Sequence, residues 1–78
     1  MDTEKFLDWL MTEKKMSARS AKDVLSRSGR VYRMLGINEL KDDTLNLLNN
    51  CEQFKDKSMF VKSQLKRTVI LCTEFMNY

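Results

Sequence analysis

The chain has 78 residues, a net charge of +3, no proline and no histidine. This length fits one small domain, residues 1–78, in which most apolar side chains must serve the core. Without histidine there is no Ser-His or Cys-His catalytic pair and no common zinc site. Glycine-rich phosphate loops are also absent. The composition therefore favours a binding module that is not an enzyme and uses no metal or cofactor.

The first predicted helix spans residues 3–15. Asp2 or Thr3 can cap its N-terminus by accepting a backbone N–H. Its core face consists of apolar side chains at helical spacing, Phe6, Trp9 and Leu10.

The second predicted helix spans residues 18–35, between Ser17 as N-cap and Gly36 in the left-handed conformation after the last turn. Its apolar stripe is Ala21, Val24, Ser28, Val31 and Leu35. Gly29 interrupts this helix. Next to Ser28 it leaves space for the close approach of a second helix or of a phosphate, and we favour the helix.

A third helix is expected over residues 44–54, with Asp42 or Asp43 as its N-cap. In the connection that precedes it, Ile37 and Leu40 are candidates for the core.

A fourth helix is expected over residues 59–77, capped by Ser58. Its apolar stripe is Val61, Leu65, Val69, Cys72 and Met76. Ile70 and Phe75 do not fit this stripe, so either the apolar face is wide or this end packs against something outside the chain. The four helices together predict a compact all-α bundle.

Charge is distributed unevenly along the chain. Residues 17–36 and 57–78 carry net charges of +4 and +3, whereas residues 1–16 and 37–56 carry −1 and −3. If the two basic segments are neighbours in space, they form one electropositive face, which suits a polyanion. The alternative is that these charges are the solvated faces of ordinary helices.

No targeting signal is recognisable. The start is acidic, unlike a signal peptide, and no apolar run approaches the roughly 20 residues of a membrane span. We therefore expect a cytoplasmic protein with no membrane contact, in which Cys51 and Cys72 are reduced core residues.

Two stretches together resemble a known family. Residues 17–36, SARSAKDVLSRSGRVYRMLG, resemble the second helix of the core-binding domain of tyrosine recombinases, the phage-integrase family. The matching positions are Ser17, Ser20, Val24, Val31, Leu35 and Gly36. Residues 6–17 resemble the first helix of that domain, and residues 58–78 resemble its fourth.

The resemblance implies a SAM-like bundle of four helices that clamps duplex DNA through its second and fourth helices during DNA integration and recombination. The family's catalytic residues belong to a separate domain that this chain lacks. Implied partners are double-stranded DNA and the catalytic domain of the same recombinase, with a monomer in isolation. The candidate DNA-binding residues are Ser17, Arg19, Ser20, Lys22, Arg27, Lys62, Ser63, Lys66 and Arg67.

The competing hypothesis is a helical protein–protein interaction module without DNA binding. One contiguous basic face from the second and fourth helices favours DNA. Scattered charge together with an exposed patch of Ile70, Phe75 and Tyr78 favours a protein partner.

Overall fold

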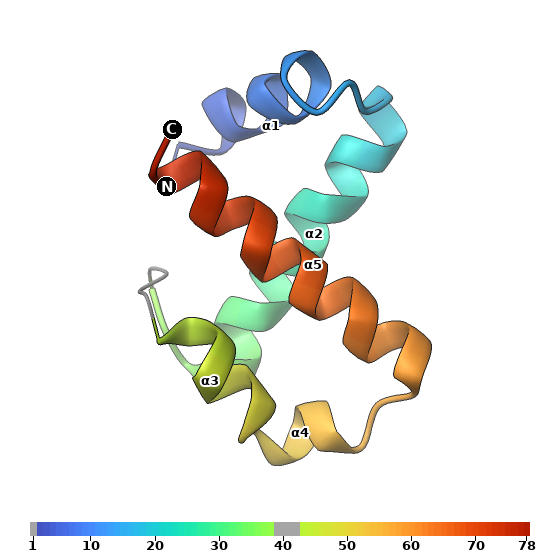
Figure 1. Ribbon diagram of the computed structural model, residues 1–78, viewed down its shortest axis with the longest axis vertical. Helices are drawn as coiled ribbons and strands as arrows, with labels where there is room; N and C mark the ends of the chain where they lie inside the picture. Colours follow the sequence, from blue (N-terminus) through green and yellow to red (C-terminus); the bar gives the residue numbers. More distant parts are fainter. Residues whose placement is uncertain (1, 39–42) are drawn as a thin grey trace.

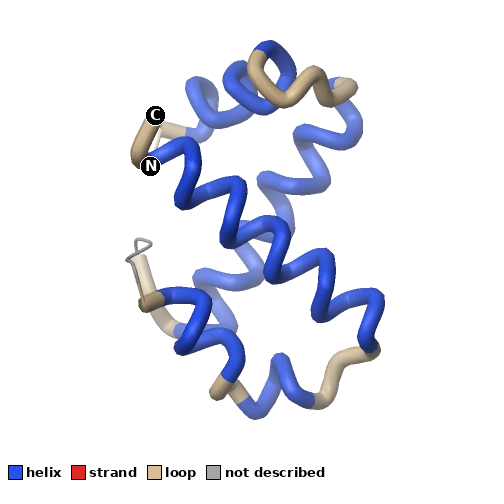
Figure 2. The backbone as a smooth tube through the Cα atoms, in the orientation of Figure 1, coloured by secondary structure: helices blue, strands red, loops and turns tan. Residues whose placement is uncertain are grey.

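Helices form nearly all of the regular structure in the computed structural model, which describes residues 2–38 and 43–78 (Figure 1; Figure 2). The described residues form five helices, α1 (Thr3–Thr12), α2 (Ala18–Leu35), α3 (Thr44–Asn49), α4 (Glu52–Lys55) and α5 (Met59–Met76). The predicted all-α class is confirmed. The predicted number of four helices is wrong, because the expected third helix is two short ones.

The two long helices begin and end where the sequence indicates. Ser17 Oγ accepts the N–H of Ser20 at 3.2 Å, and Ser58 Oγ accepts the N–H of Val61 at 3.3 Å, so each serine satisfies a backbone donor at a helix start. Gly36 follows α2 with φ of 66°, a conformation that glycine adopts without strain. The predicted caps of α2 and α5 are confirmed.

The first helix is shorter than predicted. α1 ends at Thr12 rather than at residue 15, and Lys15 has a φ of 53°. The chain turns back here, because the N–H of Met16 donates to the carbonyl of Leu10 at 3.1 Å. This turn leaves Ser17 free to start α2. At the other end the side chain of Asp2 accepts the N–H of Lys5, so Asp2 is the N-cap.

The expected helix over residues 44–54 breaks at Cys51, whose backbone is extended at φ −79° and ψ 126°. Immediately before it, the Asn50 side chain donates to the carbonyl of Asn46 at 3.0 Å. Asparagine competes with helical backbone bonds in this way, so helix continuation is disfavoured here. The break redirects the chain and buries Phe54. Asp43 occupies the N-cap position of α3 without a side-chain bond, whereas Asp42 and Leu40 lie outside the described residues.

α5 crosses α2 in an X-shaped arrangement (Figure 1). α1 covers one end of this crossing, and α3 and α4 cover the other. The radius of gyration is 12.1 Å, near the roughly 11.5 Å expected for one compact domain of this length. The core takes side chains from all five helices: Phe6, Trp9, Leu10, Ala21, Val24, Val31, Leu48, Phe54, Leu65, Val69, Leu71 and Cys72.

The apolar face of α5 is wider than one stripe. Thr68 and Leu71 are buried beside the predicted stripe, and Met76, a predicted stripe member, is exposed. The Phe75 ring lies 5.1 Å from that of Phe6 and packs into the core. A wide face therefore accounts for Phe75, whereas Ile70 remains 48% exposed.

Ser28 and Gly29 have different surroundings. Ser28 is 3% exposed and lines the tight contact between α2 and α5. A Cβ added at Gly29 would meet only the Nη1 atom of Arg33, at 3.9 Å. The close helix–helix contact expected at Ser28 and Gly29 is therefore formed at Ser28, whereas no second helix among the described residues lies within 4 Å of a Cβ at Gly29.

Two further expectations concern cysteine and membranes. Cys51 and Cys72 are free thiols, of which Cys72 is buried and Cys51 is half-buried. None of the helices in the described ranges combines the length and the apolar character needed to cross a bilayer.

Candidate nucleic-acid interface

A groove lies between the first half of α2 and the middle of α5, with a cavity volume of about 320 Å³. We call it the α2–α5 groove. Its lining residues are Met16, Ser20, Asp23, Val24, Arg27, Gln64, Arg67, Thr68 and Leu71. The groove thus brings together three of the predicted DNA-binding residues, which are Ser20, Arg27 and Arg67.

The two arginines of the α2–α5 groove come from different helices. Arg27 is half-buried on α2, and Arg67 is exposed on α5. Within residues 2–38 and 43–78, neither guanidinium makes a hydrogen bond or an ion pair. Asp23 also lines the groove, so its charge offsets one of the two arginines and leaves a surplus of one positive charge. A phosphate oxygen would find planar, unpaired donors here.

Ser17 and Ser20 form a small unit at the start of α2. Besides capping the helix, Ser17 donates its hydroxyl hydrogen to Ser20 Oγ at 3.1 Å. Ser20 Oγ is therefore an acceptor in this bond, and its own O–H is left to donate elsewhere. The prediction that Ser17 is a helix cap is confirmed. Of the two serines, Ser20 is the one that lines the α2–α5 groove.

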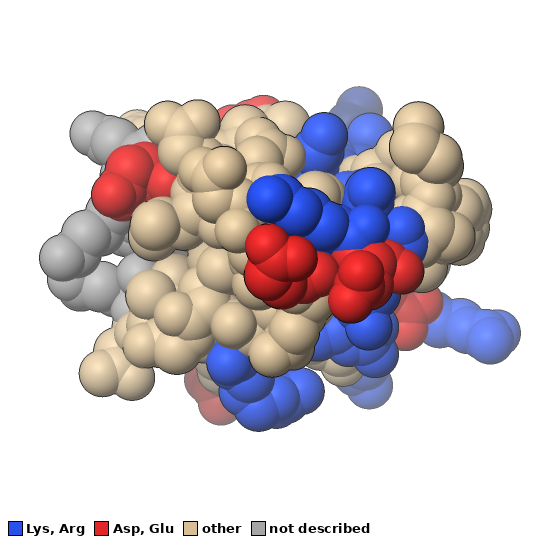
Figure 3. Space-filling view, turned by 90° about the horizontal axis from the view of Figure 1, so that it is seen from below, with Lys and Arg blue, Asp and Glu red and all other residues tan. Residues whose placement is uncertain are grey.

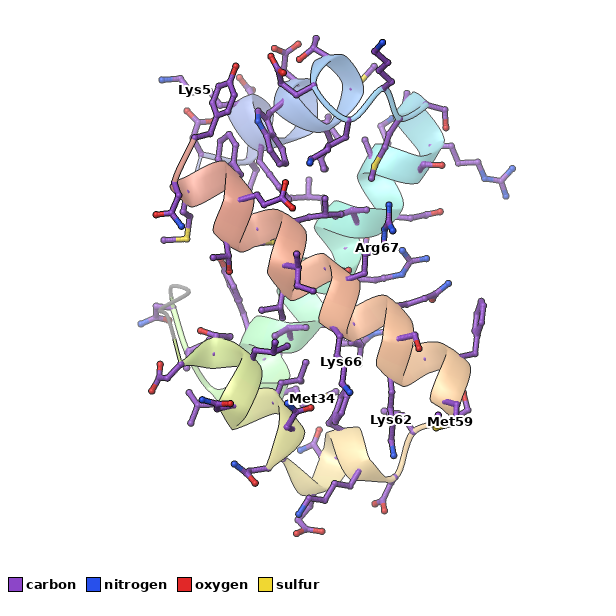
Figure 4. All side chains as sticks on the ribbon, viewed as in Figure 1. Lys5, Met34, Met59, Lys62, Lys66 and Arg67 are labelled. Atoms are coloured by element: carbon purple, nitrogen blue, oxygen red, sulfur yellow. The ribbon has the colours of Figure 1, made fainter. Side chains whose placement is uncertain are left out.

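Lys62 and Lys66 lie on another side of α5. Both extend towards α4, whereas Arg67 lies on the side of α2 (Figure 4). Their Nζ atoms lie 5.9 Å and 5.8 Å from the centre of the buried Phe54 ring. Each contact is a cation–π interaction that holds a lysine on one flank of α5.

The remaining predicted residues are not brought together. Arg19 and Lys22 are exposed on α2, and Ser63 is exposed on α5, but none of the three lines the α2–α5 groove. The nine candidates therefore divide into three groove residues, a lysine pair, three separate surface residues and Ser17, which caps α2 outside the groove.

Lys and Arg side chains gather on one side of the end formed by α3, α4 and the start of α5, and acidic side chains lie among them (Figure 3). Part of the local basic charge is neutralised, since Lys55 pairs with Glu52 at 3.8 Å. Basic side chains therefore cluster at this end, but acidic side chains interrupt them. They do not form the single electropositive face expected if the two basic segments are neighbours in space.

A second, larger groove lies between α1, α3 and α5, with a cavity volume of about 690 Å³. We call it the α1–α5 groove. It is lined by Trp9, Glu13, Lys14, Leu45, Val69, Ile70, Thr73, Glu74, Asn77 and Tyr78. Trp9 is 6% exposed, and its buried Nε1 donor has no hydrogen-bond partner among the described residues.

Polar contacts join the turn after α1 to Glu74 of α5 and to Tyr78 beside this groove. Lys14 forms an ion pair with Glu74, and its Nζ lies 5.4 Å from the centre of the Trp9 ring. Tyr78 donates its hydroxyl hydrogen to Glu13 at 2.8 Å. This bond to a carboxylate, together with the negative charge of Glu13, raises the pKa of Tyr78, because both favour the protonated phenol.

Sequence reasoning missed Met59 and Phe60, the first two residues of α5. They are 79% and 71% exposed. One signal was available in the sequence, because neither residue belongs to the apolar stripe that begins at Val61. Two adjacent large apolar residues outside such a stripe are expected at the surface.

The described residues contain no cluster of three or more histidine, cysteine, aspartate or glutamate side chains placed to hold a metal ion. Comparisons with protein-family profiles, curated proteins and solved structures give no match to this chain. The resemblance to tyrosine recombinases therefore stays a prediction from the residues that carry it.

Proposed function

We propose that this protein is a non-catalytic DNA-binding domain that holds duplex DNA across α2 and α5. The observation that carries the proposal is the pair of unpaired arginines, Arg27 and Arg67, which face one groove from two helices. Ser20 supplies a hydroxyl donor in the same groove, and Lys62 and Lys66 add positive charge on the adjoining flank of α5. Arginine is suited to phosphate oxygens and to guanine, whereas lysine mainly neutralises phosphate.

The resemblance in the sequence refines this proposal. We infer a SAM-like core-binding domain of a phage-integrase-type recombinase, acting in DNA integration and recombination in the cytoplasm. Its second partner is then the catalytic domain of the same recombinase, and the isolated piece is a monomer. A tether to that domain would strengthen DNA binding, because the second binding event becomes intramolecular.

Binding of a fluorescein-labelled duplex, followed by anisotropy over a range of salt concentrations, tests the proposal. We expect micromolar or weaker binding at low salt and a steep loss of affinity as salt rises. Arg27→Gln or Arg67→Gln should lower the affinity for the duplex. Each variant should also reduce the magnitude of the slope of log K against log salt, by about 0.9 for each phosphate contact that is lost. Reversing the charge of both Lys66 and Arg67 should weaken binding further.

Lys5→Gln is the matched control for the removal of one charge. Lys5 is exposed on α1, at the opposite end of the molecule from Lys62 (Figure 4). If Lys5→Gln weakens binding as much as Arg67→Gln does, binding responds only to net charge and the α2–α5 groove is not the site. If the parent chain leaves the duplex unbound at low salt, the proposed function is wrong.

A protein–protein interaction module is the second candidate, and the α1–α5 groove favours it. Ile70 and Tyr78 are exposed in this groove beside Trp9. Phe75, the third residue of the patch expected for that function, is packed in the core instead. Two results would support this candidate. The parent chain does not bind duplex DNA, and Ile70→Glu abolishes binding of a protein partner, whereas Arg67→Gln retains that binding.

A further inference from the structure

Met59 and Phe60 form an apolar tip at the start of α5. The tip is held on a helix end, because Ser58 caps α5 by accepting the N–H of Val61. Five of the other aromatic rings pack inside the molecule or are half-buried, Phe6, Trp9, Tyr32, Phe54 and Phe75. Phe60 is therefore unusual in presenting an uncovered ring on a rigid element.

The segment that carries the tip is basic in sequence. From Lys57 to Thr73 the chain carries four positive residues and no acidic one. The positive residues are Lys57, Lys62, Lys66 and Arg67. An exposed apolar pair inside a segment of this charge suits a partner that offers both anionic and apolar surface.

Helical spacing aligns Phe60 with the α2–α5 groove. Gln64 and Arg67 lie four and seven positions after Phe60, so the three side chains share one side of α5. Gln64 and Arg67 line the groove. Phe60 therefore extends the same line beyond the groove, towards the start of the helix.

We propose that Phe60, supported by Met59, inserts as a wedge between two base pairs of duplex DNA held at the α2–α5 groove. This inference rests on the proposed function and adds a mode of recognition to it. Apolar side chains inserted at a base step partly unstack the step and bend the duplex, while nearby cations hold the phosphates.

The shape of the tip favours duplex DNA over two other anionic partners. Proteins that bind single strands stack successive bases on several aromatic side chains, whereas Phe75 of α5 and Phe54 of α4 are packed in the core, and the exposed Tyr78 lies at the opposite end of α5 from Phe60. An amphipathic helix on an anionic membrane presents a long apolar face, whereas Leu65, Val69 and Leu71 of α5 are buried in the core.

A short duplex of repeated TA steps, with 2-aminopurine replacing adenine, tests the wedge, because TA steps unstack readily and 2-aminopurine brightens when unstacked. The parent chain should raise the fluorescence as it binds. Phe60→Ala should abolish this rise and lower affinity by about tenfold, the scale of one base–aromatic stacking interaction. The slope of log K against log salt should stay unchanged, because no charge is removed.

Two variants sharpen the comparison. Phe60→Lys adds a cation, so it should steepen the salt dependence and still abolish the fluorescence rise. Met76→Ala is the matched control, since Met76 is 51% exposed at the far end of α5. It should leave affinity and fluorescence unchanged. Phe60 and Met76 are surface residues, so circular dichroism should show all three variants folded.

The outcomes separate this inference from the proposed function. Duplex binding by the parent chain without a fluorescence rise overturns the wedge and leaves the proposed function standing, as does a Phe60→Ala variant that behaves like the parent. No duplex binding at low salt overturns both. Loss of binding to phosphatidylglycerol vesicles on Phe60→Ala, with duplex binding intact, assigns the tip to a membrane surface and also overturns the wedge.

Discussion

Gly29→Ala should make this protein more stable. Gly29 lies within α2, where glycine is less favourable than alanine because the unfolded chain has more backbone freedom to lose. The added Cβ has space, since beyond the adjoining helix backbone the described residues place only the end of the flexible Arg33 side chain within 4 Å of it, at 3.9 Å, an ordinary van der Waals distance. The substitution therefore gains helix propensity without a steric penalty.

The expected gain is about 0.5–1 kcal/mol in the free energy of unfolding. For a domain of this size, this corresponds to a rise of roughly 2–8 °C in Tm. Thermal unfolding followed by circular dichroism at 222 nm resolves such a shift, and urea unfolding provides an independent value.

Gly36→Ala is the matched control, because it makes the same chemical change at the only other glycine. Gly36 has a φ of 66°, where a Cβ is strained. This variant should lose about 1 kcal/mol or more. Glycine-to-alanine substitution should therefore raise the free energy of unfolding within α2 and lower it immediately after α2.

Destabilisation by Gly29→Ala would refute this reasoning, because it would require a close neighbour at Gly29. If stability rises but duplex binding falls, the alternative of a phosphate approaching Gly29 regains support. Unchanged binding together with increased stability agrees with the position of Gly29 away from the α2–α5 groove.

Three further predictions concern the core and a cap. Burial raises the pKa of the Cys72 thiol from 9.0 to about 12, so above pH 9 the unfolded chain ionises before the folded one. The parent should then lose up to about 1.4 kcal/mol of stability per pH unit from this thiol, a slope that Cys72→Ala should lack in urea unfolding at pH 8 to 10. Ser17→Ala should lose about 1 kcal/mol through the missing cap of α2, whereas an unchanged urea midpoint would contradict the capping role. Leu10→Ala removes a fully buried side chain and should lose about 2–5 kcal/mol, so retention of the parent Tm would contradict the position assigned to Leu10 in the core.

Local chemistry made the boundaries of α2 and α5 predictable. A serine immediately before each helix and a glycine after α2 act through hydrogen bonds and backbone angles that involve only neighbouring residues. The core face of α1 was predictable for a similar reason, since helical spacing alone places Phe6, Trp9 and Leu10 together.

The end of α1 at Thr12 and the break at Cys51 were not predicted from the same signals. The turn after α1 contains the hydrogen bond from Met16 to Leu10, and the break at Cys51 follows the Asn50 side-chain bond to Asn46, so apolar periodicity indicates neither position. The turn at Lys15 lets Ser17 start α2, and the break at Cys51 places Phe54 against α5. The packing that follows from these two turns involves residues that are distant in sequence, so the apolar periodicity of each helix does not predict it.

The candidate interface was also only partly predictable from the sequence. Counting charges along the chain identified the two basic segments. It could not identify which side chains share a surface, because that depends on how α2 crosses α5. The crossing places Arg27 and Arg67 in one groove and turns Lys62 and Lys66 towards Phe54.

The sequence by itself determined the all-α class, the caps of the two long helices and the absence of histidine chemistry, because these follow from composition and from contacts between near neighbours. Tertiary structure alone decided which cations meet and where the two grooves lie. The physical reason is that a helix fixes the angular spacing of its side chains, whereas the neighbours that cover or expose each face come from segments far away in the chain.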